Sequence, residues 1–114
     1  MKHFNAIKIH KNDRLAIEIA SKRLRHTLPI EKIILFGSKV RGDDDSESDI
    51  DLLLLTKRLI TWNERKAIID SLYDIQLDYE VIFSPFVVHS KDWYEGSFSV
   101  MPICNEILRE GVLI

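Results

Sequence analysis

The sequence predicts a small α/β (α+β) fold in which helices cover a mixed β-sheet. The chain has 114 residues and is 46% hydrophobic, which suits one compact domain with a modest core. Helix-like and strand-like apolar patterns follow each other in the order helix, strand, strand, helix, strand, helix. Because no stretch is rich in Pro, Gly or Ser, we expect residues 1–114 to form a single domain without a linker.

The first half of the chain indicates one helix and two buried strands. Residues 12–27 place apolar side chains at helical spacing, with Asn12 or Asp13 as the N-cap and Pro29 just beyond the end. Residues 31–36 and 49–55 are short apolar runs of the kind found in strands that are buried on both faces. A polar loop joins the two runs.

The second half begins with a helix signal. Residues 61–64 have the Thr-x-x-Glu form of a capping box, and an apolar stripe follows from Trp62 to Ile75. Residues 79–83 predict a third strand that stops at Ser84-Pro85, and residues 86–89 predict a short further strand. One or two helices are expected from about Lys91 to Glu110, with Gly111 as the C-cap.

Composition excludes several classes of protein. The single cysteine, Cys104, rules out an internal disulfide framework and a Cys/His cluster at zinc-finger spacing. The longest apolar run is too short to span a membrane, and the N-terminus lacks the apolar stretch of a signal peptide. We therefore expect a cytoplasmic protein with no membrane partner. Basic residues prevail up to Arg41 and acidic residues after it, an asymmetry that could steer a polyanion or simply separate charges.

A glycine-serine pair follows directly after the first predicted strand. Gly37 lets the backbone approach a phosphate closely, and the Ser38 hydroxyl and the following N–H groups can donate to its oxygens. Lys39 and Arg41 add positive charge beside the pair. Alone, a Gly-Ser pair is more often an ordinary turn, so its meaning depends on what faces it.

Two carboxylates at the start of the second strand supply that context. Asp49 and Asp51 are two residues apart, so in a strand both point to one face, roughly 6–7 Å apart, while Ile50 points to the core. Carboxylates and phosphates are the ligands that Mg²⁺ prefers, and a third carboxylate is expected nearby. Asp78 and Glu80 both lie at the start of the third predicted strand, and we favour Glu80.

These residues together resemble a known family. Gly37-Ser38, ten intervening residues and Asp49-x-Asp51 resemble the signature of the minimal nucleotidyltransferases (MNT) of the DNA polymerase β superfamily. Arg41-Gly42 and Ser48 also occupy matching positions. The resemblance implies the nucleotidyltransferase fold, Mg²⁺, and ATP or another NTP as substrate.

The resemblance also implies a role for each site residue. Gly37 and Ser38, with Lys39, Arg41 and Ser48 nearby, would hold the triphosphate. The catalytic and metal-binding carboxylates would be Asp49, Asp51 and Glu80. The family more usually has Asp at the third position, so Glu80 is a departure from its pattern.

Many members of this family are encoded beside a HEPN-domain partner, in pairs that look like toxin–antitoxin systems. By that resemblance the chain would be the antitoxin, would assemble with the HEPN-type partner, and would transfer AMP from ATP to a hydroxyl on it. One alternative is a catalytically weak nucleotide-binding module that neutralises the partner by complex formation. Another is transfer to a small molecule or a nucleic acid end, although the chain shows no accessory domain for recognising nucleic acid.

Other polar residues have simpler interpretations. Asp43, Asp44, Asp45 and Glu47 are better explained by a solvated loop than by a calcium loop, because the glycine expected at its sixth position is Ser48. The four histidines are scattered and are interpreted as structural or surface residues. Cys104 is typical of a small core residue. Trp93, Tyr94 and Phe98 are interpreted as packing groups, with a patch for a partner helix as the alternative.

Overall fold

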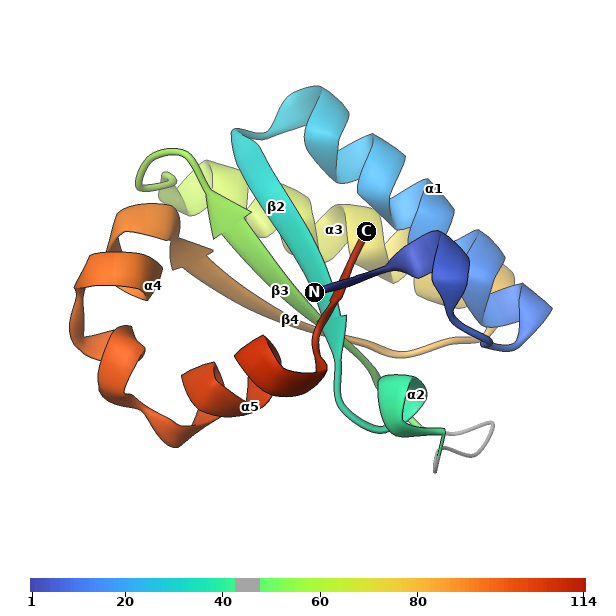
Figure 1. Ribbon diagram of the computed structural model, residues 1–114. Helices are drawn as coiled ribbons and strands as arrows, with labels where there is room; N and C mark the ends of the chain where they lie inside the picture. The colour runs from blue at the N-terminus through green and yellow to red at the C-terminus, as the bar shows by residue number, and fades with distance from the viewer. Residues whose placement is uncertain (43–47) are drawn as a thin grey trace.

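A five-stranded mixed β-sheet with helices on both faces forms the computed structural model, which describes residues 1–42 and 48–114 (Figure 1). The strands are β1 (Lys2–His3), β2 (Ile30–Phe36), β3 (Ile50–Thr56), β4 (Phe83–His89) and β5 (Val112–Leu113), in the spatial order β1-β5-β2-β3-β4. Strands β2 and β3 are antiparallel, whereas β3 and β4 are parallel, with β4 at one edge. The predicted fold class is confirmed.

The helices form two layers. They are α1 (Lys11–Thr27), α2 (Ser38–Arg41), α3 (Trp62–Tyr79), α4 (Ser90–Glu95) and α5 (Pro102–Glu110), with single turns of 3₁₀ helix at Phe4–Ala6 and Ser97–Val100. Helices α1 and α3 pack on one face of the sheet, and α4 and α5 lie on the other, as Figure 1 shows. The short helix α2 follows directly after the last residue of β2 (Figure 1).

Strand β3 explains how both faces come to be buried. Its side chains alternate, so that Leu52 and Leu54 join the core beneath α1 and α3, while Leu53 and Leu55 join the core beneath α4 and α5. A strand covered on both sides has no solvent face, which is why this stretch is apolar at nearly every position. Asp51 lies in the same alternation as Leu53 and therefore belongs to the α4–α5 face.

The predicted ends of the first two long helices are partly corrected. Helix α1 begins one residue earlier than expected, with His10 as its N-cap, so the predicted cap at Asn12 or Asp13 is wrong. The Asn12 amide instead donates to the carbonyl oxygen of Tyr79 at 2.7 Å and so ties α1 to the end of α3. The capping box of α3 is confirmed, because the Glu64 N–H donates to the Thr61 hydroxyl at 3.1 Å and the Thr61 N–H donates to the Glu64 carboxylate at 2.9 Å. Trp62 does not join the buried stripe and is 79% exposed.

The third strand starts later than predicted. Residues 79–83 were expected to be extended, but α3 continues to Tyr79 and Glu80 follows as its C-cap with a left-handed backbone, φ 54° and ψ 47°. The physical reason is that Tyr79 packs against the same core as Ile75 and extends the buried stripe of the helix by one turn. Strand β4 then runs from Phe83 through Pro85, because an edge strand tolerates a residue without an N–H group.

The C-terminal region, for which the sequence predicts one or two helices, forms two, α4 and α5. Helix α5 ends at Gly111 as predicted, and Cys104 is a buried core residue. Trp93 is buried and its ring stacks on Phe98, so these two residues are the predicted packing groups, whereas Tyr94 is exposed. The sequence did not predict β1 and β5, two-residue strands whose parallel pairing brings the two ends of the chain side by side (Figure 1).

Two further expectations concern the predicted solvated loop and membrane-spanning segments. The predicted solvated loop at Asp43, Asp44, Asp45 and Glu47 lies outside the described residues. Of the helices that are described, none combines the length and the apolar character needed to cross a lipid bilayer.

Candidate active site

The turn between β2 and α2 and the start of β3 build the candidate site. Antiparallel pairing places Phe36 opposite Asp51, so the Gly37 turn passes directly beside the Asp51 carboxylate. Gly37 has φ 83° and ψ −156°, a conformation that residues with a Cβ avoid, and an added Cβ would collide with Asp51 Oδ2. Glycine is therefore required here both by the backbone and by the carboxylate.

Ser38 begins the short helix that follows this glycine. The N–H groups of Val40 and Arg41 donate to the Gly37 carbonyl at 3.1 and 3.3 Å, which closes the turn. The first N–H groups of a helix point outward from its start, and in α2 those positions belong to Ser38 and Lys39. The turn thus places the N–H groups of Ser38 and Lys39 at the first positions of α2, directly after Gly37.

The structure brings Asp49 and Asp51 together. Asp49 directly precedes β3 and is exposed, whereas Asp51 is the second residue of the strand and is half-buried. Partial burial, and then the negative charge of Asp49, raise the pKa of the Asp51 carboxyl, while Arg41 acts to lower it. Two neighbouring carboxylates of this kind are a donor set that a divalent cation would satisfy.

The two cationic residues of α2 point in different directions. Lys39, which we expected beside a phosphate, is buried and its Nζ donates to Asp13 Oδ2 of α1 at 2.9 Å. Arg41 instead reaches toward α5, where its Nη1 lies 3.0 Å from Glu110 Oε1 and 3.5 Å from Glu106 Oε1. Of these two residues, only Arg41 lies on the side of the turn that carries Asp51. Ser48, directly before Asp49, is half-exposed.

The structure does not bring Glu80 to the two aspartates. Glu80 follows the last turn of α3 and lines a pocket with His10, Asn12, Asp13 and Tyr79, next to the start of α1. Asp78 lies within α3 and is exposed, so it is not on a strand either. Within residues 1–42 and 48–114, no three His, Cys, Asp or Glu side chains are grouped closely enough to hold a metal ion.

Sequence reasoning missed a different residue at this position. Ser84 of β4 pairs with Asp51 in the parallel register, and its hydroxyl donates to Asp49 Oδ2 at 2.8 Å. The serine was interpreted as the end of a strand because a proline follows it. The available signal was the apolar run on both sides of Ser84-Pro85, which fits one continuous edge strand.

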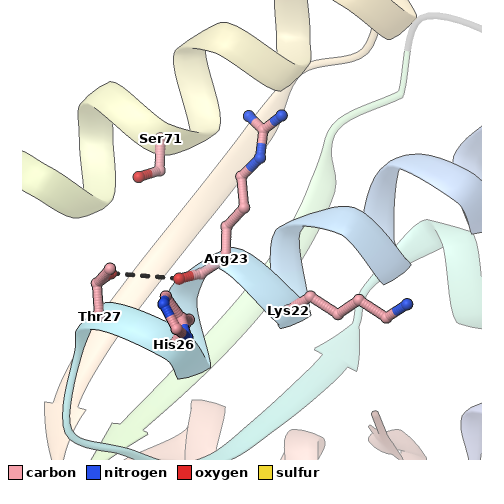
Figure 2. Close-up of a pocket in the computed structure, with 5 residues that line it drawn as sticks. All are labelled: Lys22, Arg23, His26, Thr27 and Ser71. Carbon is pink, nitrogen blue, oxygen red and sulfur yellow. Dashed lines mark hydrogen bonds between the residues drawn. The ribbon is translucent and has the colours of Figure 1, made fainter.

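A groove of about 470 Å³ lies at the other end of the sheet (Figure 2). Its lining residues are Lys22, Arg23, His26, Thr27 and Ser71. In Figure 2 the Arg23 side chain extends from α1 toward α3, and the Ser71 side chain extends from α3 toward α1. Thr27 precedes the start of β2, whereas Asp51 pairs with its last residue, so this basic groove is separate from the carboxylates.

Comparison with known proteins agrees with the motif. Residues 18–95 match the family described as polymerase beta nucleotidyltransferase. A protein of Methanocaldococcus jannaschii named as a candidate protein adenylyltransferase is 41% identical over 58 residues, which are 51% of this chain and 59% of that protein. The matched segment thus spans less than two thirds of the relative.

Two crystal structures show the same fold. One is a toxin–antitoxin complex with AMP-PNP, which matches with a TM-score of 0.59 at 17% sequence identity. The alignment covers 91% of this chain and 72% of the matched chain. The other, a mutant of the toxin–antitoxin complex MntA–HpeT, has a TM-score of 0.56 at 18% identity and covers 94% of this chain and 72% of that chain. The predicted resemblance to nucleotidyltransferases of the polymerase β superfamily is confirmed.

Proposed function

Because this chain belongs to the polymerase beta nucleotidyltransferase family, we propose that it transfers AMP from ATP to a hydroxyl group of a partner protein. The observation that carries the proposal is the Gly37 turn packed against Asp51, with Asp49 beside it. The arrangement supports the proposal, because nucleotidyl transfer requires backbone N–H donors for the phosphates beside carboxylates for a cation.

The proposed reaction exchanges one phosphoester for another. The acceptor hydroxyl oxygen forms a bond to the α-phosphorus of ATP as the bond from that phosphorus to the bridging oxygen breaks. Pyrophosphate leaves with the electron pair of the broken bond, and the hydroxyl proton is released to solvent. The products are an AMP–hydroxyl ester, pyrophosphate and one proton.

The residues of the turn would bind and orient the nucleotide. Gly37 and Ser38 would hold the triphosphate through backbone N–H groups and the serine hydroxyl, with Ser48 and Arg41 at the side of the site. Asp49 and Asp51 have the oxygen donors that suit Mg²⁺, which when bound supplies charge neutralisation for the phosphates. Lys39 is left out of this set, because its ammonium group is buried against Asp13.

We propose a HEPN-domain toxin as the acceptor, which makes this chain the antitoxin of a pair. Support comes from the name of the Methanocaldococcus relative, a candidate protein adenylyltransferase, and from the toxin–antitoxin complexes that share the fold. Transfer to a small molecule or a nucleic acid end is the outcome that an acceptor screen would reveal instead.

One observation favours a second candidate function. The described residues supply two grouped carboxylates, not three, and a site with fewer ligands has lower affinity for its cation. The chain would then bind a nucleotide weakly and neutralise its partner by forming a complex. Tight complex formation without detectable transfer would distinguish this function from catalysis.

The test is transfer of radiolabel from ATP to protein in a cell lysate containing Mg²⁺. We expect α-labelled ATP, and not γ-labelled ATP, to label an acceptor band, and Asp49→Ala/Asp51→Ala to abolish the labelling. The matched control is Asp70→Ala/Asp74→Ala, which removes two exposed carboxylates from α3 and should label as well as wild type. Labelling from γ-labelled ATP, or unchanged labelling by Asp49→Ala/Asp51→Ala, would contradict the proposal.

A further inference from the structure

Ser84 occupies the place on β4 that is nearest to both aspartates. In the parallel register of β3 and β4, Asp51 pairs with Ser84, and residues that pair across neighbouring strands lie on the same face of the sheet. The pairs that follow along the same face, Leu53 with Phe86 and Leu55 with Val88, all contribute to the core beneath α4 and α5. The side chain of Ser84 is therefore on the carboxylate side of the sheet.

The hydroxyl of this serine is committed to one of the carboxylates. Ser84 Oγ donates to Asp49 Oδ2 at 2.8 Å, a normal length for an O–H···O hydrogen bond. Asp49 precedes β3 and is exposed, so the strand itself does not fix its side chain. The hydrogen bond across to β4 supplies that constraint and leaves the other carboxylate oxygen of Asp49 available.

Within residues 1–42 and 48–114, the strand next to β3 supplies no carboxylate beside the two aspartates. Residues 83–89 form β4 and contain no Asp or Glu, and Glu80 is held at the C-cap of α3 with a left-handed backbone. Glu80 lines the pocket beside α1, together with Asp13, which belongs to the opposite layer from α5. A neutral side chain thus takes the third position next to Asp49 and Asp51.

We propose that Ser84 is a positioning residue of a cation site with two carboxylates, orienting Asp49 through its hydroxyl and adding no charge of its own. This inference rests on the proposed function in assigning Asp49 and Asp51 to a divalent cation. Residues that hydrogen-bond a ligand typically change cation affinity 10–100-fold when they are removed. The number of charged ligands sets affinity as well, so a carboxylate at this position should tighten binding.

The experiment is a titration of Mn²⁺ into the nucleotide-free protein, followed by electron paramagnetic resonance. Mn²⁺ prefers the same oxygen ligands as Mg²⁺ and is directly visible by this method. We expect Ser84→Ala to weaken binding by about tenfold and Ser84→Thr, which keeps a hydroxyl and suits a strand, to retain the wild-type affinity. Ser84→Asp should tighten binding by about tenfold or more.

The control for added charge is Ser97→Asp, at an exposed serine in the 3₁₀ turn that follows α4. The inference is overturned if Ser84→Ala binds Mn²⁺ as well as Ser84→Thr does, or if Ser84→Asp binds no more tightly than Ser97→Asp. Thermal unfolding of each variant shows whether it is folded. If Ser84→Ala does not fold, the Mn²⁺ affinities of Ser84→Thr and Ser84→Asp still test the inference.

Failure of this inference and failure of the proposed function are distinguishable. The Mn²⁺ titration uses neither ATP nor an acceptor, so a protein that transfers no nucleotide can still show the expected order of affinities. Conversely, the α label could be transferred while all Ser84 variants bind Mn²⁺ with equal affinity. That result would contradict the positioning role of Ser84 and would leave the proposed transferase function unaffected.

Discussion

The two sides of the Gly37 turn each carry a basic residue of α2, but these two residues differ in burial and in pairing. Lys39 and Arg41 are two positions apart on α2, yet Lys39 is 4% exposed and paired with Asp13, whereas the Arg41 side chain is 43% exposed. The side that faces α1 is closed and packed. The side that faces α5 carries Asp49, Asp51 and Ser84 and remains open to solvent. One side therefore holds the turn in place, and the other side is available for chemistry.

The largest expected effect is on the closed side. Asp13→Ala removes a carboxylate that pairs with a buried ammonium group, and breaking a buried pair costs up to about 3–5 kcal/mol. Urea unfolding measures the loss against Glu18→Ala, an exposed carboxylate on the same helix that should change stability by no more than about 0.5 kcal/mol. Equal losses in the two variants would mean that the Lys39–Asp13 pair does not stabilise the fold.

The next effect joins the two sides, because Gly37 is both a backbone requirement and a contact of Asp51. Gly37→Ala places a Cβ against Asp51 Oδ2 in a strained conformation, so we expect a loss of about 1–3 kcal/mol and loss of nucleotide transfer. Gly42→Ala is the control, since Gly42 also has a positive φ but has open space around its Cα. That variant should cost about 1–2 kcal/mol and retain transfer. Transfer by Gly37→Ala at the wild-type rate would separate the turn from the carboxylates.

The same contrast explains how much of the site the sequence could predict. The Gly37 turn follows β2, and the two aspartates lie at the start of β3, which pairs antiparallel with β2. Local patterns therefore predicted β2, β3 and the nearness of Gly37 to Asp51. The capping box that begins α3 was predictable for the same reason, because Thr61 and Glu64 satisfy each other within a single turn.

The remaining features depend on contacts between distant parts of the chain. Glu80 is placed by the length of α3, which the packing of Tyr79 decides, and Ser84 is placed by the parallel register of β3 and β4. In the sequence, Lys39 has the charge and the position expected of a phosphate ligand. Its hydrogen bond to Asp13 depends on the position of α1, which lies far away along the chain. Strands β1 and β5 contain two residues each, too few to show a pattern of their own.

A smaller effect on stability is expected from the raised pKa of Asp51 on the open side of the turn. The pKa of Asp51 is raised in the folded protein, so its ionisation disfavours folding, and this penalty appears as the pH rises through that pKa. Asp51→Asn should therefore raise the free energy of unfolding at pH 7 by less than about 1 kcal/mol. The gain should vanish below about pH 3, where the carboxyl is protonated in both states. Asp74→Asn, at an exposed position on α3, should change little at either pH.

The smallest expected effect tests whether Arg41 acts on the open side as a weak electrostatic partner. Its exposed pairs with Glu106 and Glu110 are worth less than about 1 kcal/mol, and added salt should reduce them further. Arg41 also lowers the pKa of Asp51, so without it the Asp51 charge is more costly. A double-mutant cycle should show that Asp51→Asn stabilises Arg41→Ala more than it stabilises wild type.

In the matched cycle with Lys66→Ala, an exposed lysine on α3, the two gains should be equal. If Asp51→Asn stabilises the Arg41→Ala and wild-type proteins equally at low salt, Arg41 does not act on the carboxylates. The raised pKa of Asp51 would then be explained by its own partial burial and by the negative charge of Asp49, and Arg41 would keep its pair with Glu110 of α5.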